Sequence, residues 1–301
     1  MGRPDGPILV AGGDRDPNLR ALVACLEGRG EPVFFLRVGE SHHPSVTWEL
    51  ESGRLVVDGE EVRPRAAFVR YDVFTHLADG RPASSFRAGS WYTAVTGWLA
   101  VHEEARILNR RSLHRSTNKP EALYRARLSG LAVPPTLVTN HLAELPGFAP
   151  ERPKIVKPIN GGGHCQRLDE VLETTPSRDG VAASPAIVQT ELVPPEVRVF
   201  GIGGRFLAFS VASDDLDYRV RQSARVEALA EVPDGLAEGL GQLMDGMGLD
   251  FGAADFKTCP ETGRLLFLEI NSGPMFAAFD QAAGGAVAGA IADFLVREGA
   301  R

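Results

Sequence analysis

The chain has 301 residues and a formal net charge of −7, and it is 44% hydrophobic and 24% charged. This length accommodates two domains, or one large domain built from several lobes. Proteins that bind a phosphate backbone usually carry a basic excess, which this chain lacks, so we expect no nucleic-acid partner. The cysteines are odd in number and widely spaced, which argues against a disulfide scaffold or a local metal motif: Cys25, Cys165 and Cys259.

No targeting or membrane segment is apparent in the sequence. The N-terminus lacks the apolar run of a signal peptide, and no stretch reaches about 18 consecutive apolar residues. We therefore expect a soluble, cytoplasmic protein with no membrane partner. The composition does not decide between a monomer and a homo-oligomer.

The first third of the chain alternates between predicted strands and helices. PILVAGG is an apolar strand that enters a glycine turn, residues 16–29 form a helix, and PVFFLRV is a second strand. This order indicates a parallel sheet whose loops face a ligand. The loop GGDRDPN is not a GxGxxG motif, so dinucleotide binding is disfavoured.

Further elements follow from local patterns. Residues 47–62 predict a hairpin and residues 66–74 another strand. We predict a helix over residues 90–104 because its apolar side chains share one face: Trp91, Val95, Trp98 and Leu99.

A second unit begins within residues 105–136. Pro120 suits the first turn of a helix and Gly130 suits its end. The last predicted helix lies in residues 284–301.

The segment PKIVKPINGGGHC combines a strand lysine, Lys157, with a glycine loop. Gly161, Gly162 and Gly163 allow the backbone to approach a ligand and to direct N–H groups at anionic oxygens. A lysine beside such a loop supplies a positive charge for phosphate. The lysine precedes the glycines, so the segment is no Walker A loop. A surface hairpin with a flexible turn is the structural alternative.

The segment SPAIVQTELVPPEVRVFGIGGRFLAFSV predicts strand, connector, strand, glycine turn and strand. Adenine needs an apolar slot with backbone hydrogen-bonding groups, and ribose needs a carboxylate. The connector at residues 189–192, with Glu196 beyond it, offers both. The alternative is a solvated Glu196–Arg198 pair on an edge strand.

The segment LDFGAADFKTCPETGRLLFLEINSGPMF predicts two strands around the turn PETG. Glu269 and Asn271 are two residues apart and share a face, and Asp255 joins them if the register is even. Two carboxylates and an amide oxygen suit Mg²⁺ shared with substrate phosphates. Among apolar neighbours, unpaired carboxylates need a cation or another partner. A capped strand end is the alternative.

Together these motifs resemble the ATP-grasp superfamily. A lysine before a helix, a strand lysine with a glycine loop, a hinge with a glutamate, and D…ExN follow one another in that family's order. The chain resembles the D-alanine–D-alanine ligase and glutathione synthetase branch. It is more similar to ligases that add glutamate or cross-link ribosomal peptides. The resemblance covers Ser116 to the C-terminus, with a looser match before it.

The resemblance implies an α/β ATP-grasp fold in three parts. Residues 1–115 would form a Rossmann-like (pre-ATP-grasp) domain, residues 116–184 the small ATP-grasp lobe, and residues 185–301 the large C-terminal lobe. ATP would lie between the last two.

The resemblance also implies roles for individual residues. The nucleotide would be held by phosphate-binding lysines, the glycine loop, the adenine hinge and a ribose carboxylate: Lys119, Lys157, Gly161, Gly162, Gly163, Gln189, Thr190, Leu192 and Glu196. Mg²⁺, or Mn²⁺, would bind Asp255, Glu269 and Asn271. Three arginines would act near the transferred phosphate or acyl group: Arg198, Arg219 and Arg221.

Some residues depart from the family pattern or have no assigned role. His164 and Cys165 follow the glycines, where relatives differ. Arg70, Tyr71 and Arg87 are candidates for recognising a substrate carboxylate at the mouth of the N-terminal sheet.

The implied activity is that of an ADP-forming carbon–nitrogen ligase. A carboxylate would be activated by ATP as an acyl phosphate, and an amine or similar nucleophile would displace phosphate. We expect an amino-acid-like or peptide substrate in biosynthesis, including that of antibiotics. Three variants remain open: joining two small molecules, modifying a ribosomal peptide, or closing a ring as a D-cycloserine ligase does. A small-molecule kinase and a non-catalytic nucleotide-binding module are the rival classes.

Overall fold

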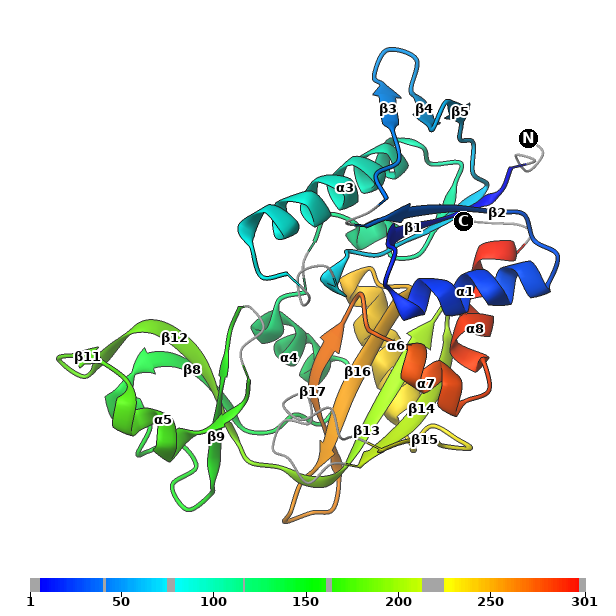
Figure 1. Ribbon diagram of the computed structural model, residues 1–301. Coiled ribbons are helices and arrows are strands. Elements are labelled where there is room, and N and C mark those ends of the chain that lie inside the picture. Colours follow the sequence, from blue (N-terminus) through cyan, green and yellow to red (C-terminus); the bar gives the residue numbers. More distant parts are fainter. Residues whose placement is uncertain are drawn as a thin grey trace.

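The computed structural model describes residues 6–39, 42–74, 79–115, 117–160, 164–212 and 225–297. Its elements form three groups. Figure 1 shows them as a blue and cyan N-terminal lobe, a green lobe on the left, and a large sheet that includes the orange strands and lies beside the red helices. None of the helices in these ranges is both long and apolar enough to span a membrane.

The N-terminal lobe is built on a parallel sheet with the strand order β2-β1-β6-β7. Its elements are β1 (Ile8–Gly13), α1 (Pro17–Gly28), β2 (Val33–Val38), β6 (Ala66–Val69), α3 (Pro82–Val101) and β7 (Arg106–Ile107). Helix α1 packs with Ile8 and Val10 on one face, and α3 packs with Leu9 and Ala11 on the other. The predicted Rossmann-like arrangement is confirmed.

The two N-terminal helices differ in how well the sequence predicts them. Helix α1 starts where Asp16 accepts a hydrogen bond from the Asn18 N–H, close to the predicted boundary. Helix α3 begins eight residues before the predicted start at Ser90, so that boundary is wrong. Its first turns contain the exposed Phe86 and lack an apolar face, which is why periodicity did not detect them.

A small antiparallel sheet caps this lobe. The predicted hairpin is confirmed as β3 (Val46–Glu49) and β4 (Arg54–Val57), and β5 (Glu60–Glu61) adds a short third strand. Its residues Leu55 and Val57 pack against the core on the α3 side of the parallel sheet.

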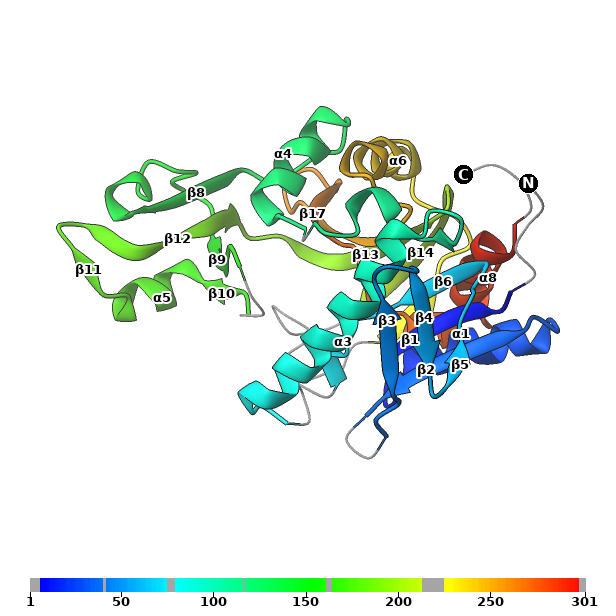
Figure 2. The same ribbon diagram turned by 90° about the horizontal axis from the view of Figure 1, so that it is seen from above.

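The second lobe has an antiparallel sheet in which β12 pairs with β8, β9 and β11, and β10 pairs with β9. The strands are β8 (Thr136–His141), β9 (Lys154–Pro158), β10 (Gln166–Arg167), β11 (Ser177–Arg178) and β12 (Val181–Thr190), with α5 (Leu168–Thr174) and the 3-10 turn η2 (Leu142–Glu144). Val156 and Val188 pack towards α5, so Lys157 and Gln189 point to the other face. Figure 2 shows β12 leading out of this lobe into β13.

The third group is an antiparallel sheet with the order β15-β14-β13-β16-β17. Its strands are β13 (Val193–Ile202), β14 (Arg205–Ala212), β15 (Arg225–Ala228), β16 (Phe251–Thr258) and β17 (Leu265–Asn271). One face packs on α4 (Lys119–Leu128) and α6 (Leu236–Met247), and the other on α7 (Ala277–Ala282) and α8 (Ala286–Val296). The first residues of α4 include Pro120, and Gly130 follows its end with φ +79°, as predicted.

The large sheet shares its core with the N-terminal lobe. Phe200 and Phe251 lie in one buried cluster with Leu19 and Leu22 of α1 and with Ile291 of α8. The ion pair between Arg29 and Asp293 adds a surface contact between the same two helices. Burial of this common core stabilises the contact between the two ends of the chain.

Asn109, just before the 3-10 turn η1 (Arg110–Ser112), links the N-terminal lobe to the large sheet. Its Nδ2 donates to the carbonyls of Phe251 (2.8 Å) and Ser272 (3.0 Å), and its Oδ1 accepts from the N–H groups of Asp250 and Phe251 (both 2.8 Å). Its φ of 58° is left-handed, which asparagine tolerates better than most residues. One side chain therefore holds the start of β16 against the end of β17.

We predict that Asn109→Ala lowers the free energy of unfolding by roughly 2–4 kcal/mol, because it leaves several backbone groups unpaired and places alanine at a positive φ. Urea unfolding checks this. Asn140→Ala, which removes one hydrogen bond to the Ala182 carbonyl, is the matched control and should cost about 1 kcal/mol. Equal losses in the two variants would contradict the bridging role of Asn109.

Candidate active site

One face of the large sheet carries five of the predicted site residues. In its central row, Arg198 of β13 lies opposite Asp255 of β16, and Asp255 lies opposite Glu269 of β17. Side chains alternate between the two faces of a strand, so residues two positions away share this face. The flanking rows are Glu196 opposite Lys257, and Asn271 opposite Ala253.

A register shift in the β16–β17 pair decides this arrangement. Phe256 pairs with Phe267, whereas Asp255 pairs with Glu269, so Leu268 is the extra residue of a β-bulge. Without the bulge Asp255 would face Leu268, and Glu269 would point into the core beside Ala254. The bulge therefore supplies the even register that the sequence analysis required.

Arg198 and Asp255 form a bidentate ion pair. The Arg198 Nε and Nη2 donate to the two Asp255 carboxylate oxygens at 2.6 and 2.7 Å, and both side chains are buried. The guanidinium carbon lies 5.1 Å from the centre of the Phe279 ring on α7, which is a cation–π distance. Arg198 is thus held by a carboxylate and an aromatic ring, and the alternative of a solvated edge-strand charge pair is wrong.

Glu196 lies in an environment that favours its neutral form. Burial, and secondly the negative charge of Asp255, raise the pKa of the Glu196 carboxyl to about 7, although Lys257, Arg198 and Lys157 oppose the shift. Its carboxylate is therefore costly near neutral pH unless a partner stabilises it.

Two lysines approach the same face from other elements. Lys119, the first residue of α4, places its Nζ 3.7 Å from a Glu269 carboxylate oxygen. Lys157 comes from β9 of the second lobe, and burial lowers the pKa of its ammonium. The charges of Glu269 and Asp255 raise that pKa, so these carboxylates lie near enough to Lys157 to act on it.

The predicted hinge joins the two lobes and is buried. Gln189 and Thr190 end β12, and Leu192 lies in the connector to β13. The Gln189 side-chain N–H donates to the Thr136 hydroxyl at 2.9 Å, but Gln189 Oε1 and Thr190 Oγ1 have no hydrogen-bond partner among the described residues. Buried polar atoms normally have partners, so these two atoms are exceptions among the described residues.

Solved structures match nearly the whole chain. The ATP-grasp ligase PsnB in complex with a minimal precursor has 24% identity and a TM-score of 0.76, over 97% of this chain and 98% of that chain. The macrocyclase MdnC from Microcystis aeruginosa MRC, bound with precursor peptide MdnA, has 19% identity and a TM-score of 0.75, over 97% and 100%. The D-cycloserine synthetase DcsG has 18% identity and a TM-score of 0.58, over 96% and 100%. No protein-family model and no curated protein matches the chain.

The chain has the ATP-grasp fold. Within this fold the structure brings the two predicted lysines to the predicted residues on the sheet face, and it places the predicted hinge in the connector between β12 and β13. Five predicted residues lie outside the described ranges: Gly161, Gly162, Gly163, Arg219 and Arg221. His164 and Cys165 lie just after the first of these gaps, and Cys165 is close enough to Lys157 to act on its pKa.

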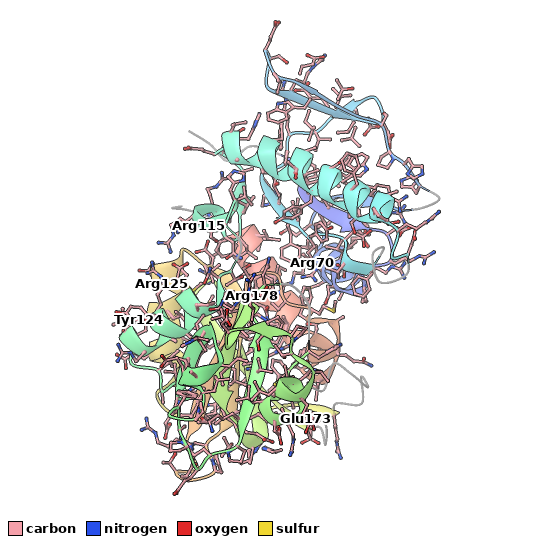
Figure 3. All side chains as sticks on the ribbon, turned by 90° about the vertical axis from the view of Figure 1, so that its left-hand side faces the viewer. Arg70, Arg115, Tyr124, Arg125, Glu173 and Arg178 are labelled. Carbon is pink, nitrogen blue, oxygen red and sulfur yellow. The ribbon has the colours of Figure 1, made fainter. Side chains whose placement is uncertain are left out.

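The three candidates at the N-terminal sheet differ from one another. Arg70 is buried and paired with Asp16, Tyr71 is on the surface, and Arg87 on α3 lines a hollow. In Figure 3, Arg70 lies where the N-terminal lobe meets the rest of the chain.

Sequence reasoning missed three kinds of contributor to the site. Lys257 is two residues from Asp255, so strand parity could have placed it on the site face, but no motif singled it out. Asn109 gave no signal, because its partners are backbone groups distant in sequence. Asp16 was detectable only as a helix cap, not as the partner of Arg70.

We predict that Glu196→Gln stabilises the protein at high pH and not at low pH. The pKa of the Glu196 carboxyl is higher in the folded protein than in the unfolded chain, so the unfolded chain ionises first as pH rises. The free energy of unfolding therefore falls as pH rises from about 4.5 to about 7. This shift corresponds to at most about 3 kcal/mol. Urea unfolding should therefore show a gain of about 1–3 kcal/mol for the variant at about pH 8, which vanishes near pH 4.5.

The matched control for this comparison is Glu173→Gln, on the exposed side of α5 (Figure 3). The difference in free energy of unfolding between Glu173→Gln and the original protein should stay constant over the same pH range. A Glu196→Gln effect that is constant with pH would contradict the assignment of the titration to Glu196.

Proposed function

We propose that the protein is an ADP-forming ATP-dependent ligase, which activates a substrate carboxylate as an acyl phosphate and joins it to an amine or similar nucleophile. The observation that carries this proposal is the row Arg198–Asp255–Glu269, approached by Lys119 and Lys157, within an ATP-grasp fold. Solved structures with this fold include the ligase PsnB complexed with Mg and ADP, and the same ligase complexed with AMPPNP.

The nucleotide would lie between the second lobe and the large sheet. The buried, unpartnered oxygens of Gln189 and Thr190 and the apolar Leu192 suit an adenine slot. Glu196 would accept from the ribose hydroxyls, and these donors would stabilise its carboxylate. Lys119, Lys157 and the loop of Gly161, Gly162 and Gly163 would hold the phosphates. The lobe limits at residues 115 and 184 are part of this proposal.

The metal-binding group would be Asp255, Glu269 and Asn271. No group of three or more histidine, cysteine or acidic side chains that could hold a metal occurs in the described ranges, so the substrate phosphates would complete the coordination. Arg198 uses two of roughly four lone-pair sites on the Asp255 carboxylate, which leaves acceptor capacity for a cation. Mg²⁺ or Mn²⁺ would neutralise phosphate charge at this face.

The protein's own residues would mainly position the reactants and balance charge. Arg198 is pre-organised by Asp255 and Phe279, so little reorganisation is needed when negative charge develops nearby. Arg219 and Arg221 would add positive charge beside the acyl phosphate. Transfer of a phosphoryl group to a carboxylate needs no protein nucleophile.

A peptide substrate is favoured over ring closure within a small molecule. The TM-scores are 0.76 and 0.75 for two enzymes whose structures contain precursors, and 0.58 for the D-cycloserine synthetase. We therefore place peptide modification first among the ligase reactions, with an amino-acid-like small molecule second.

We predict that Glu269→Gln raises the magnesium concentration needed for nucleotide turnover by at least about tenfold. The variant keeps the shape of the side chain but removes one negative charge from the metal-binding group. Lys119 loses its ion-pair partner at the same time. ATP turnover across a magnesium titration measures this. Asp245→Asn, on an exposed side chain paired with Arg111, is the control and should leave the titration unchanged. An unchanged titration in Glu269→Gln would refute the metal assignment.

We predict that hydroxylamine traps an acyl phosphate. With ATP and the carboxylate substrate present, hydroxylamine should give a hydroxamate, together with ADP and free phosphate in equal amounts. Without the carboxylate, only slow hydrolysis of ATP should remain. Acidic amino acids and peptides that contain them form the substrate panel.

The products also distinguish the rival functions. A stable phosphorylated product, without hydroxamate or free phosphate, would identify a kinase. Nucleotide binding with no turnover on any member of the panel would favour a non-catalytic module.

A further inference from the structure

A second candidate site lies in the N-terminal lobe, away from the predicted nucleotide residues. It is a hollow, open to solvent, between α3 and the carboxyl ends of β1, β2 and β6. Its floor is apolar and buried, and includes Leu36, Val38 and Val95. Its partly exposed rim carries Arg87, Trp91 and Tyr92 of α3. Its enclosed space is only about 20 Å³, so a ligand group would lie over the opening of the hollow and not inside it.

The hollow lies at the switch point of the parallel sheet. The strand order β2-β1-β6-β7 reverses between β1 and β6, and α1 and α3 leave to opposite faces. Open parallel sheets bind ligands outside the carboxyl ends of their strands at such a point. The residues Ala11 and Gly12 of β1 and Val69 of β6 line the hollow from both sides of the reversal.

The two glycines that end β1, Gly12 and Gly13, shape this hollow and not a phosphate site. A Cβ on Gly12 would meet the Arg70 carbonyl at 2.9 Å, and a Cβ on Gly13 would collide with the Asp72 carboxylate. The two glycines therefore allow β1 to lie against the residues that follow β6. This close approach places Asp72 at the buried side of the hollow, where its carboxylate disfavours a deep anion.

Arg87 provides the recognition group at the rim. Its side chain is partly buried and has no hydrogen-bond or ion-pair partner among the described residues. By contrast, Arg70 already has partners, because its Nε donates to Asp16 at 2.9 Å and its Nη1 donates to the Pro274 carbonyl at 2.7 Å. A guanidinium beside an apolar hollow suits a carboxylate that is attached to an apolar group.

The hollow is tied to the proposed ligase site through Arg70. Pro274, which accepts from Arg70, lies three residues after Asn271 at the end of β17. Asn18 of α1 accepts from the N–H groups of Phe276 and Ala277 in the same segment, at 2.6 and 2.7 Å. The hollow and the metal group therefore share one connecting loop, a suitable position for a substrate subsite.

We propose that this hollow is a substrate subsite for a carboxylate adjoining an apolar side chain, with the side chain over the apolar opening of the hollow and the carboxylate on Arg87. The assignment to substrate rests on the proposed ligase function, whereas binding to the hollow does not. Two sources share this chemistry: a free carboxylated amino-acid derivative, and an acidic residue beside an apolar one within a peptide.

Fluorine NMR of protein labelled with 5-fluorotryptophan tests the subsite without nucleotide. The chain has three tryptophans, and Trp91 alone lines the hollow. Trp91→Phe assigns its signal. N-acetyl-leucine is compared with its amide, and the capped dipeptide Leu-Glu with capped Leu-Gln. In at least one pair the carboxylate should shift the Trp91 signal at about a tenfold lower concentration than the amide.

Variants at Arg87 separate charge recognition from simple filling of the hollow. Arg87→Met should abolish the preference for the carboxylate, and Arg87→Lys should keep part of it. Unchanged Trp48 and Trp98 signals show that each variant is folded. Arg178→Met, at an exposed position in β11, is the control and should behave like the original protein.

The outcomes decide both the subsite and its ligand. A preference in the amino-acid pair identifies a small-molecule source, and a preference in the dipeptide pair identifies a peptide. The proposal is overturned if neither carboxylate shifts Trp91, if carboxylate and amide act equally in both pairs, or if Arg87→Met keeps the preference. Failure of hydroxamate formation would remove the ligase function but leave this binding result intact.

Discussion

The bidentate pair between Arg198 and Asp255 is the interaction on which the polar face of the large sheet depends. Its partners lie on neighbouring strands, both nearly out of water, so either charge alone would be costly. Together they allow Glu196, Lys257 and Glu269 to share the face. Phe279 of α7 covers the guanidinium, so the helix that closes the core also restrains the central charge of the site.

A second polar network joins this sheet to the N-terminal lobe. Asp16 caps α1, accepts from Arg70 after β6, and accepts from the Asn18 side chain. Arg70 and Asn18 in turn bond the backbone that follows β17. Because these contacts are buried and charge-assisted, a displacement of the N-terminal sheet would leave several polar groups unpaired. The network therefore fixes the segment after β17 to the N-terminal lobe.

Much of the fold could be predicted because its signals are local. The strand and glycine turn from β1 into α1, the helix between Pro120 and Gly130, and the strand–turn–strand around PETG all follow from neighbouring residues. The start of α3 could not, since its first turns are exposed and have no apolar periodicity. The roles of Asn109 and Asp16 could not be predicted for another reason, because the groups that they hydrogen-bond are distant in the sequence.

The sequence by itself determined which chemical groups exist and which of them share a strand parity. Glu196 with Arg198, Asp255 with Lys257, and Glu269 with Asn271 must each lie on one side of their strand. Only the tertiary structure decided that these three pairs face the same way. The bulge at Leu268 turns Glu269 and Asn271 towards Asp255, and the pairing of β13 with β16 brings Arg198 to the same carboxylate. Register depends on packing between strands that are distant in the chain, and one residue of slip would have moved the carboxylates of β17 into the core.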